Sequence, residues 1–452
     1  MKKIGYLLLA IVCLLGLALA GCSRGGGGAN GTLVVLHYRT EDAAFYEWMA
    51  DQFEEEYDCT VQLDLVGTDG WGQVLEGRLA GNSVDVFGVY PGSVYRDDAT
   101  LPYMMDLSDM DFVDLLTDEY VDYATYTDGK VYCAPLNLVN DTVFYNKDIF
   151  EEYGLEEPTT YDEFIEICET LKAHSKDFGK AGNTINGVEL VSPIIFGGRE
   201  TWPITMTLNS IEAPIVRAQD PWFYVDVFKN KTKSLDDPLI EEMFAKYKEI
   251  SSYYQVNSFG LSYSRVPSLF AQGGYAMLID GSWSYSQIIA TETDVDFEIG
   301  VFPLPANDNA QYNNYVVGKP GSGFAIHKDT QQAELAKAFI EFQYREDIYS
   351  RFLSEVSMGS VLKGVENPSD DPIIDELYNS DYTYIAPLSE YIISCMSYPH
   401  SICEQLAIGE KDVDYAINQF VSDYNRCASQ VDSLMDRWMA LYNKGYEENT
   451  VA

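Results

Sequence analysis

Two tryptophans stand where a side chain can reach a ligand instead of filling a core. Trp283 follows the apolar run 276–279 and the turn residues 280–282, and Trp202 lies in the segment ETWP just after the glycine pair 197–198. Aromatic side chains offer a large apolar contact area and lose few rotamers when they bind. These positions therefore predict non-covalent binding, with core packing as the alternative for each ring.

Polar side chains follow the expected strands in the first part of the chain. Tyr38, Thr40 and Glu41 come directly after the first strand, and Tyr90 ends the third. Open α/β sheets bind ligands at the carboxyl ends of their strands, so these residues are candidates for ligand contact, with a solvated loop as the alternative. Arg199, beside the glycine pair, can bind a carboxylate or hydroxyl groups, or form a surface ion pair.

The sequence carries no recognisable signature of catalysis or of a metal site. With 71 Asp and Glu residues, a pair of carboxylates is always available, so their number does not indicate a glycosidase. No G-x-S-x-G, H-E-x-x-H or P-loop motif occurs. The four histidines are scattered and no C-x-x-C pair is present. We therefore expect no enzyme, no metal and no cofactor.

Six cysteines remain beyond Cys13 and Cys22, and their spacing does not define a disulfide framework. They are Cys59, Cys133, Cys168, Cys395, Cys403 and Cys427. Cys168 falls on the apolar face of an expected helix, as a buried thiol acting as a small hydrophobe would. The sequence favours free thiols, with disulfides as the alternative for a secreted chain.

The elements that would position these residues alternate between strand and helix. Strands are expected at 32–38, 60–66 and 83–90, with a helix at 43–57 whose apolar residues have helical spacing. This alternation predicts an α/β class with a parallel sheet. A further helix begins after Thr160, which with Glu163 three residues later forms a capping box.

The N-terminus resembles a secretory signal that ends in a lipid-attachment site. Two lysines precede the apolar stretch 4–20, and LALAGC resembles the lipobox of bacterial lipoproteins. Residues 1–21 are thus expected to be a lipoprotein signal peptide, and 22–31 a lipidated Cys22 with a Gly-rich tether. The chain would then be anchored at the extracellular face of the cell membrane. An ordinary signal peptide is the alternative.

Charge and length restrict the remaining classes. Removing residues 1–21 leaves 27 of the 29 basic residues against 71 acidic ones. So acidic a chain excludes nucleic-acid binding and predicts a heavily solvated surface. A chain of 452 residues exceeds what one core usually supports, so two lobes are expected.

Four segments, in order, resemble the extracellular solute-binding proteins of ABC importers, and in particular their carbohydrate-binding subgroup. They are APLNLVNDTVFYNKDIFEEYGLEEPTTYDEF, FAQGGYAMLIDGSW, EIGVFPLP and GSGFAIHKDTQQAELAKAFIEF. The resemblance implies a type II periplasmic-binding-protein-like fold with two discontinuous lobes joined by a hinge. Chain crossings would fall near 137–141, 300–303 and 345.

The crossings imply a division of the chain into two lobes. The N-terminal lobe would contain 32–138 plus 302–345, and the C-terminal lobe 139–301 plus 346–447. A monomer would capture a mono- or oligosaccharide between the lobes and deliver it to ABC transporter permease subunits. A surface-anchored glycosidase, an adhesin and a binder of a non-sugar solute are the alternatives.

The resemblance also assigns roles to individual residues. Trp283 matches the position of a stacking Trp of the family, and Trp202 resembles a second aromatic segment of its cleft. Asn137 and Asn140 would stand at the hinge crossing, where their polar side chains can face the cleft. Asn140 could equally satisfy backbone groups in a turn. Tyr398 corresponds to an aromatic-bearing late helix.

Overall fold

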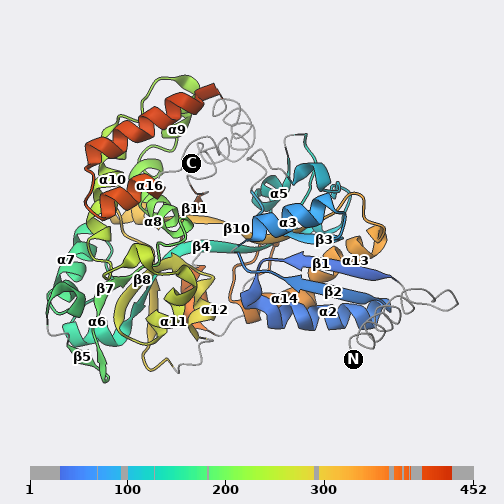
Figure 1. Cartoon of the computed structure of the whole chain (residues 1–452), viewed down its shortest axis with the longest axis horizontal. Coiled ribbons are helices and arrows are strands. Elements are labelled where there is room, and N and C mark those ends of the chain that lie inside the picture. Colours follow the sequence, from blue (N-terminus) through green and yellow to red (C-terminus); the bar gives the residue numbers. More distant parts are fainter. Residues whose placement is uncertain are drawn as a thin grey trace, which may run out of the picture.

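The computed structural model describes residues 31–68, 70–92, 100–126, 128–180, 183–289, 295–365, 371–378, 381–385, 387 and 400–429. The expected signal peptide, Cys22 and Tyr398 lie outside these ranges. Within them the chain forms two α/β lobes (Figure 1).

The N-terminal lobe begins with the expected alternation of strands and helices. β1 (Thr32–His37) pairs in parallel with β2 (Thr60–Leu65) on one side and β3 (Val86–Val89) on the other. The lobe also contains α2 (Ala43–Tyr57), α3 (Trp71–Ala80), α4 (Phe112–Leu115), α5 (Asp118–Ala124), α13 (Ala333–Gln343) and α14 (Glu346–Val356). The predicted parallel arrangement is confirmed for these three strands. The helices α2 and α3 connect them and return the chain, so that β1, β2 and β3 run in the same direction.

The C-terminal lobe is built from the middle and the end of the chain. Its strands are β5 (Thr184–Ile185), β6 (Val188–Glu189), β7 (Ser192–Ile195), β8 (Tyr275–Gly281) and β9 (Ile299–Phe302). Its helices are α6 (Lys147–Tyr153), α7 (Tyr161–Lys172), α8 (Trp202–Glu212), α9 (Phe223–Val225), α10 (Pro238–Ser251), α11 (Val266–Ala271), α12 (Ser284–Ile289), α15 (Pro372–Leu377) and α16 (His400–Ala407). The predicted capping box is confirmed, because the Thr160 and Glu163 side chains reciprocally bond backbone N–H groups at the start of α7.

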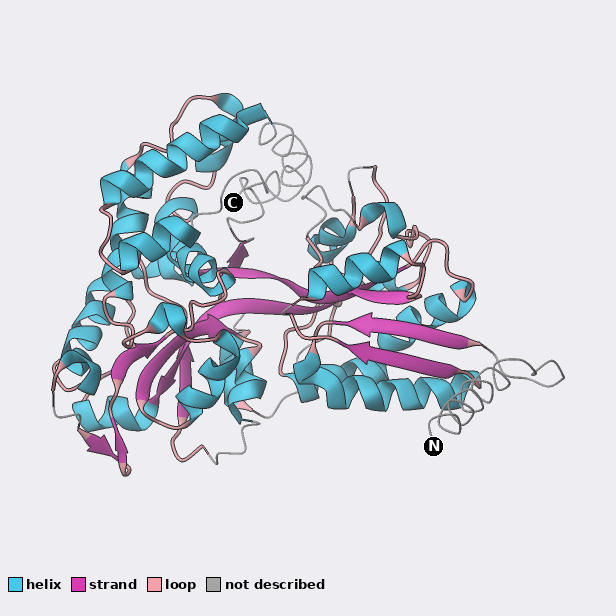
Figure 2. Ribbon diagram, in the orientation of Figure 1, coloured by secondary structure: helices cyan, strands magenta, loops and turns pink. Residues whose placement is uncertain are grey.

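Two long strands join the lobes (Figure 2). β4 (Ala134–Asn146) and β10 (Tyr315–Ile326) are antiparallel, and the continuous sheet has the order β2-β1-β3-β10-β4-β8-β7. β4 pairs with β10 as far as Asn140 and with β8 from Asp141 onward. This change of partner falls within the segment 137–141 that was expected to cross. β11 (Thr383–Ile385) adds to β10.

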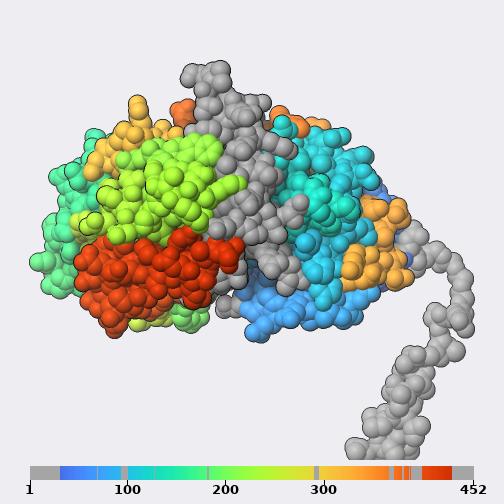
Figure 3. Space-filling view, turned by 90° about the horizontal axis from the view of Figure 1, so that it is seen from above, coloured from blue at the N-terminus to red at the C-terminus, as the bar shows by residue number. Residues whose placement is uncertain are grey.

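The buried side chains form separate cores in the two lobes. The N-lobe core includes Phe53 and Phe87 from the start of the chain and Phe339 and Phe352 from much later. Two further clusters fill the C-terminal lobe, one around Phe164 and Phe244 and a smaller one around Phe144 and Leu278. Figure 3 shows the lobes as two bodies, with blue and cyan residues in one and green and red residues in the other.

Core membership shows where the chain passes from one lobe to the other. Phe302, Leu304 and Ala306 pack in the C-terminal lobe, and the return to the N-lobe core runs along β10. Residues from Ile348 to Leu362 also belong to the N-lobe core. The expected crossings near 300–303 and 345 remain a prediction. Among the described residues, β9 pairs with β4 and α14 packs on α2.

The described cysteines include free thiols and one disulfide-bonded residue. Cys59, Cys168 and Cys403 carry free thiols, and Cys168 is fully buried in α7 as predicted. Cys427 is disulfide-bonded, so the preference for free thiols is wrong at this position. Local spacing does not reveal such a bond, because tertiary contacts decide which cysteines approach each other.

The described residues hold no helix with the length and apolar character needed to cross a membrane. The same residues hold no group of three or more His, Cys, Asp or Glu side chains arranged to hold a metal ion.

Candidate ligand-binding site

Trp283 follows β8, in the turn that leads into α12. Its ring folds back over the strand end, where a Cβ on Gly281 would lie 2.1 Å from the ring carbons. A glycine is therefore required at position 281 for this ring position. Trp283 is half-buried and packs against the N-lobe core, although β8 belongs to the C-terminal lobe. The residue thus lies at the junction of the two lobes.

Trp202 and Trp283, distant in sequence, come together around Tyr263. The ring centroid of Trp202 lies 4.3 Å from that of Tyr263 and 6.1 Å from that of Trp283. Trp202 is the first residue of α8 and remains 38% exposed. We call Trp202, Tyr263 and Trp283 the aromatic corner. Its exposed Trp202 ring leaves an apolar surface available to a ligand.

The glycine pair before Trp202 permits the close packing of the loops that form the aromatic corner. A Cβ on Gly197 would lie 2.5 Å from Val266 and 3.0 Å from the Tyr263 backbone. A Cβ on Gly198 would lie 2.8 Å from the Phe259 ring. The lack of side chains at these two positions therefore allows the loop after β7 to pack closely against the segment that contains Tyr263.

Hydrogen bonds fix Tyr263 from two sides. Its hydroxyl accepts from Trp283 Nε1 at 2.7 Å and lies 3.0 Å from both Asp280 Oδ1 and Ser284 Oγ. Its backbone N–H donates to Glu200 Oε2 at 2.7 Å. Burial would raise the pKa of Glu200, but this bond and those from Ser262 and Arg199 hold it below the ordinary value. Glu200 is thus an anion that orders the loop.

Two buried carboxyl groups lie behind the aromatic corner on neighbouring strands. Asp280 of β8 is opposite Thr142 of β4, and Asp141 is opposite Gly281. Burial raises the pKa of Asp280 to about 7, against hydrogen bonds from Ser284, Gly281 and Tyr263. Burial also raises the pKa of Asp141 to about 7, opposed by a hydrogen bond from Ser210 and by Lys319, while Asp280 adds repulsion. Both groups are therefore sensitive to pH near neutrality.

At the ends of β1 and β3, Tyr38 and Tyr90 stack with ring centroids 4.2 Å apart. Tyr38 is only 3% exposed, and its hydroxyl lies 3.2 Å from the Val89 carbonyl and 3.0 Å from that of Gly321. Tyr90 is 40% exposed. Of this pair, Tyr90 is therefore the ring with surface to offer a ligand.

The loop after β1 contains a buried cation. Thr40 and Glu41 are exposed, whereas Arg39 is buried and forms an ion pair with Asp42. Arg39 Nη1 also lies 3.4 Å from Glu41 Oε1. The two carboxylates compensate the guanidinium charge, so this loop presents hydrogen-bonding groups without excess positive charge.

Tyr378 links the aromatic corner to the N-terminal lobe. Burial raises the pKa of Tyr378, and the nearby positive charge of Arg39 opposes this rise. The Tyr378 hydroxyl bonds to Ser282 Oγ at 3.0 Å and to the Ser357 carbonyl at 3.3 Å. Because Ser282 directly precedes Trp283 and Ser357 ends α14, Tyr378 ties the end of β8 to a helix of the N-terminal lobe.

The two predicted asparagines lie on β4 at the point where the lobes join. Asn137 Oδ1 accepts from the N–H and hydroxyl of Ser322 at 2.9 and 2.7 Å, and its amide contacts Met358. The Asn140 side-chain amide donates to the Leu377 carbonyl. Both residues are buried, so the bonds that they make in this structure tie together the segments of the junction.

Arg199 has an exposed side chain that pairs with Glu200, with Nη2 to Oε1 at 2.8 Å, and reaches Ser262 at the same distance. A surface ion pair is the alternative to ligand binding that the sequence left open for Arg199, and this ion pair forms beside the aromatic corner. Ligand contact by Arg199 and by the other predicted residues remains a prediction.

Sequence reasoning missed Tyr263, Asp280, Arg39 and Tyr378. Arg39 lies between two residues that were selected for following β1, so the strand-end argument extends to it. Asp280 was noted only as a turn residue. Tyr263 and Tyr378 carry no local signal, because their importance comes from contacts with distant segments.

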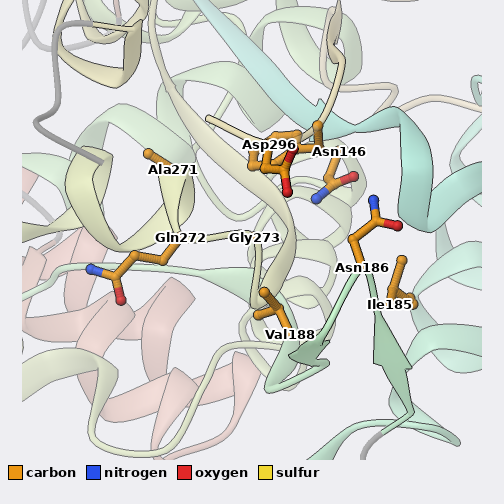
Figure 4. Close-up of a pocket in the computed structure, with 9 residues that line it drawn as sticks. Asn146, Ile185, Asn186, Val188, Ala271, Gln272, Gly273 and Asp296 are labelled. Atoms are coloured by element: carbon orange, nitrogen blue, oxygen red, sulfur yellow. The ribbon is translucent and has the colours of Figure 1, made fainter. Parts of the chain in front are cut away.

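A pocket of about 220 Å³ lies elsewhere, in the C-terminal lobe at the far end of β4 (Figure 4). Its lining consists of Asn146, Ile185, Asn186, Val188, Ala271, Gln272, Gly273, Asp296 and Phe297. In Figure 4 the Asn146 and Asn186 amides and the Asp296 carboxylate approach one another, while Gln272 points away. None of the predicted site residues lines this pocket.

Comparison with known proteins shows similarity along most of the chain. It is 25% identical over 397 residues to the multiple sugar-binding protein of Streptococcus mutans, covering 85% of this chain and 89% of that protein. It is also 25% identical over 398 residues to the melibiose/raffinose/stachyose-binding protein MelE of Bacillus subtilis, covering 85% of each. The solved structure of RafE in complex with raffinose has a TM-score of 0.72 at 22% identity, covering 88% of this chain and 99% of that one.

These similarities confirm the predicted two-lobed α/β fold. The family model for bacterial extracellular solute-binding proteins matches residues 38–348, which is more than half of the chain and includes β4, β8 and both tryptophans of the aromatic corner. The chain belongs to the bacterial extracellular solute-binding proteins.

Proposed function

We propose that this chain captures a sugar or oligosaccharide between its lobes and delivers it to the permease subunits of an ABC importer. The aromatic corner is the observation that carries the proposal, since it presents the exposed Trp202 ring at the junction of the lobes. The similarity to a multiple sugar-binding protein, to a melibiose/raffinose/stachyose-binding protein and to RafE in complex with raffinose supports a carbohydrate.

A carbohydrate suits the chemistry of the junction. The apolar C–H face of a sugar ring packs on an aromatic ring, and we assign that role to Trp283, Trp202 and Tyr90. Hydroxyl groups need donors and acceptors, which the exposed Glu41 supplies and the buried Arg39 would supply when the lobes move. Because Arg39 is compensated by Asp42 and Glu41, a neutral ligand fits better than an anionic one.

The remaining predicted residues stay candidates for the proposed site. We retain Tyr38, Thr40, Asn137, Asn140, Arg199 and Tyr398 as candidate ligand contacts. Tyr38 and the two asparagines are buried, so a ligand would meet them only when the lobes move. Tyr398 lies outside the described residues.

We propose lobes that follow core membership. The N-terminal lobe would contain residues 32–140 together with 320–362, and the C-terminal lobe the intervening segment together with the end of the chain. β4 and β10 would then form the hinge about which the lobes close on the ligand.

We further propose that the protein is a monomeric lipoprotein, held at the extracellular face of the membrane by lipid on Cys22. The signal-like residues 1–21, the lipobox-like LALAGC and the Gly-rich tether support this anchor. The membership of an extracellular family agrees with a location outside the cytoplasm.

The proposal is tested by ligand binding and by the absence of turnover. Purified residues 23–452 are titrated with melibiose, raffinose, stachyose, maltose and monosaccharides, with melting temperature and calorimetric heat as measurements. A ligand that binds the folded state raises the melting temperature by mass action. Chromatography after prolonged incubation should return every sugar intact. No binding by any sugar would refute the carbohydrate assignment, and accumulation of a hydrolysis product would indicate an enzyme.

A further inference from the structure

A chain of hydrogen bonds runs from the Trp283 ring into the interior of the C-terminal lobe. Indole Nε1–H is a donor only, and here it donates to the Tyr263 hydroxyl at 2.7 Å. That hydroxyl lies 3.0 Å from Asp280 Oδ1. The ring at the junction is thereby connected to a fully buried carboxyl group on β8.

The direction of these hydrogen bonds follows from which groups can donate a proton and which can accept one. A tyrosine hydroxyl has one proton and can accept while it donates. Since Trp283 can only donate, the Tyr263 oxygen accepts from the indole, and its own proton is available for Asp280. Asp280 also accepts from the Gly281 N–H at 2.8 Å and from Ser284 Oγ at 2.7 Å. When the Asp280 carboxyl group is ionised, all the protons therefore point toward it.

The carboxylate is itself held in place by the sheet. Asp280 lies on β8 opposite Thr142 of β4, and three donors converge on its two oxygens. A buried and fully bonded group of this kind has few alternative positions. Its partner Tyr263 is also fixed from behind by the Glu200 carboxylate on its backbone N–H.

We propose that Tyr263 and Asp280 are positioning residues that hold the Trp283 ring in its binding orientation, with its N–H engaged and only its faces available to the ligand. This inference rests on the proposed function, because it assigns Trp283 to ligand contact. An indole that is already oriented loses less freedom on binding, so the hydrogen-bond chain contributes to affinity without touching the ligand.

The first experiment needs no ligand. The chain has six tryptophans, and Trp283→Phe identifies the Trp283 indole signal in a ¹H–¹⁵N spectrum. Tyr263→Phe keeps the ring that contacts Trp202 but removes the acceptor, so the Trp283 signal should move upfield. Asp280→Ala should move it in the same sense, whereas Asp280→Asn should leave it close to the wild-type position, since Asn retains the acceptor oxygen.

The second experiment is a double-mutant cycle on raffinose affinity, measured by calorimetry. Tyr263→Phe should weaken binding about fivefold in the wild-type background, as the loss of one hydrogen bond does. In the Trp283→Phe background, which lacks the indole donor, the same change should cost less than twofold. Tyr253→Phe is the matched control, because Tyr253 is buried and donates to Glu169 away from the junction.

Two results would overturn the inference. One is a Trp283 indole signal that does not move in Tyr263→Phe, and the other is an equal loss of affinity in the two backgrounds. If the wild-type chain binds no sugar, the proposed function fails, and the indole signal alone decides whether Tyr263 holds Trp283. The two failures are therefore distinguishable.

Discussion

The buried carboxyl group of Asp280 makes a definite prediction about stability and pH. Burial raises its folded-state pKa to about 7, from an ordinary value of 3.8 that applies when the chain is unfolded. The folded state therefore holds this proton more tightly than the unfolded state does. For a carboxyl group shifted in this direction, the free energy of unfolding rises as pH falls through 7, and the gain is complete near pH 4.

The magnitude follows from these two values. Between pH 8 and pH 5 the folded state takes up the proton while the unfolded state remains ionised, which stabilises the fold by about 2.5 kcal/mol. Asp280→Asn removes this titration and keeps the acceptor oxygen. Because Asp280 also raises the pKa of Asp141, the substitution weakens the pH dependence of its neighbour as well.

The assay is guanidinium unfolding of the wild type and of Asp280→Asn at pH 5 and pH 8. For each protein, the free energy of unfolding at pH 8 is compared with its value at pH 5. The loss between pH 5 and pH 8 should be smaller in Asp280→Asn than in the wild type by at least about 2 kcal/mol. Asp106→Asn is the control. Hydrogen bonds from Lys130 and Ser108 lower the pKa of Asp106 to about 2, so it does not titrate in this interval. Parallel profiles for the wild type and Asp280→Asn would refute the reasoning.

Four further substitutions test other parts of the molecule. Trp283→Ala should weaken sugar binding more than tenfold in calorimetry while circular dichroism remains native, and unchanged affinity would remove Trp283 from the site. Thr160→Ala removes the cap of α7 and should lower the free energy of unfolding by about 1 kcal/mol without changing affinity, so an equal stability would contradict the capping role. Tyr378→Phe removes the bonds to Ser282 and Ser357, so X-ray scattering of the ligand-free protein should give a larger radius of gyration. An unchanged radius would show that these bonds do not hold the lobes together. Cys22→Ser should move the protein from the membrane fraction to the medium, and retention in the membrane would argue against the lipid anchor.

The sequence allowed several local features to be predicted correctly. Strand and helix alternation in residues 32–90, the Thr160–Glu163 capping box and the burial of Cys168 depend on neighbours within a few positions. Patterns of this range are visible in the chain itself because hydrophobic periodicity and capping act locally. The four segments that resemble the solute-binding proteins, in the same order along the chain, allowed the fold class to be predicted as well.

The candidate site was predictable only in part. Trp283 and Trp202 were selected one at a time, from turn residues beside them, and nothing in the sequence joined them. The structure brings their ring centroids to 6.1 Å through Tyr263, a residue without any local signal. Conversely, Tyr38 was selected for its place after β1, but the tertiary contacts engage its hydroxyl and bury its ring.

The sequence by itself determined the class of the chain, its acidic surface and the positions of its strong caps and turns. Tertiary structure decided where β4 changes partners, which lobe α14 joins, and that Asp280 and Tyr263 stand behind Trp283. These outcomes depend on strand register and on packing between segments far apart in the chain. A pattern of neighbouring residues contains no record of such contacts, because the free energy that selects them arises only when distant surfaces are buried together.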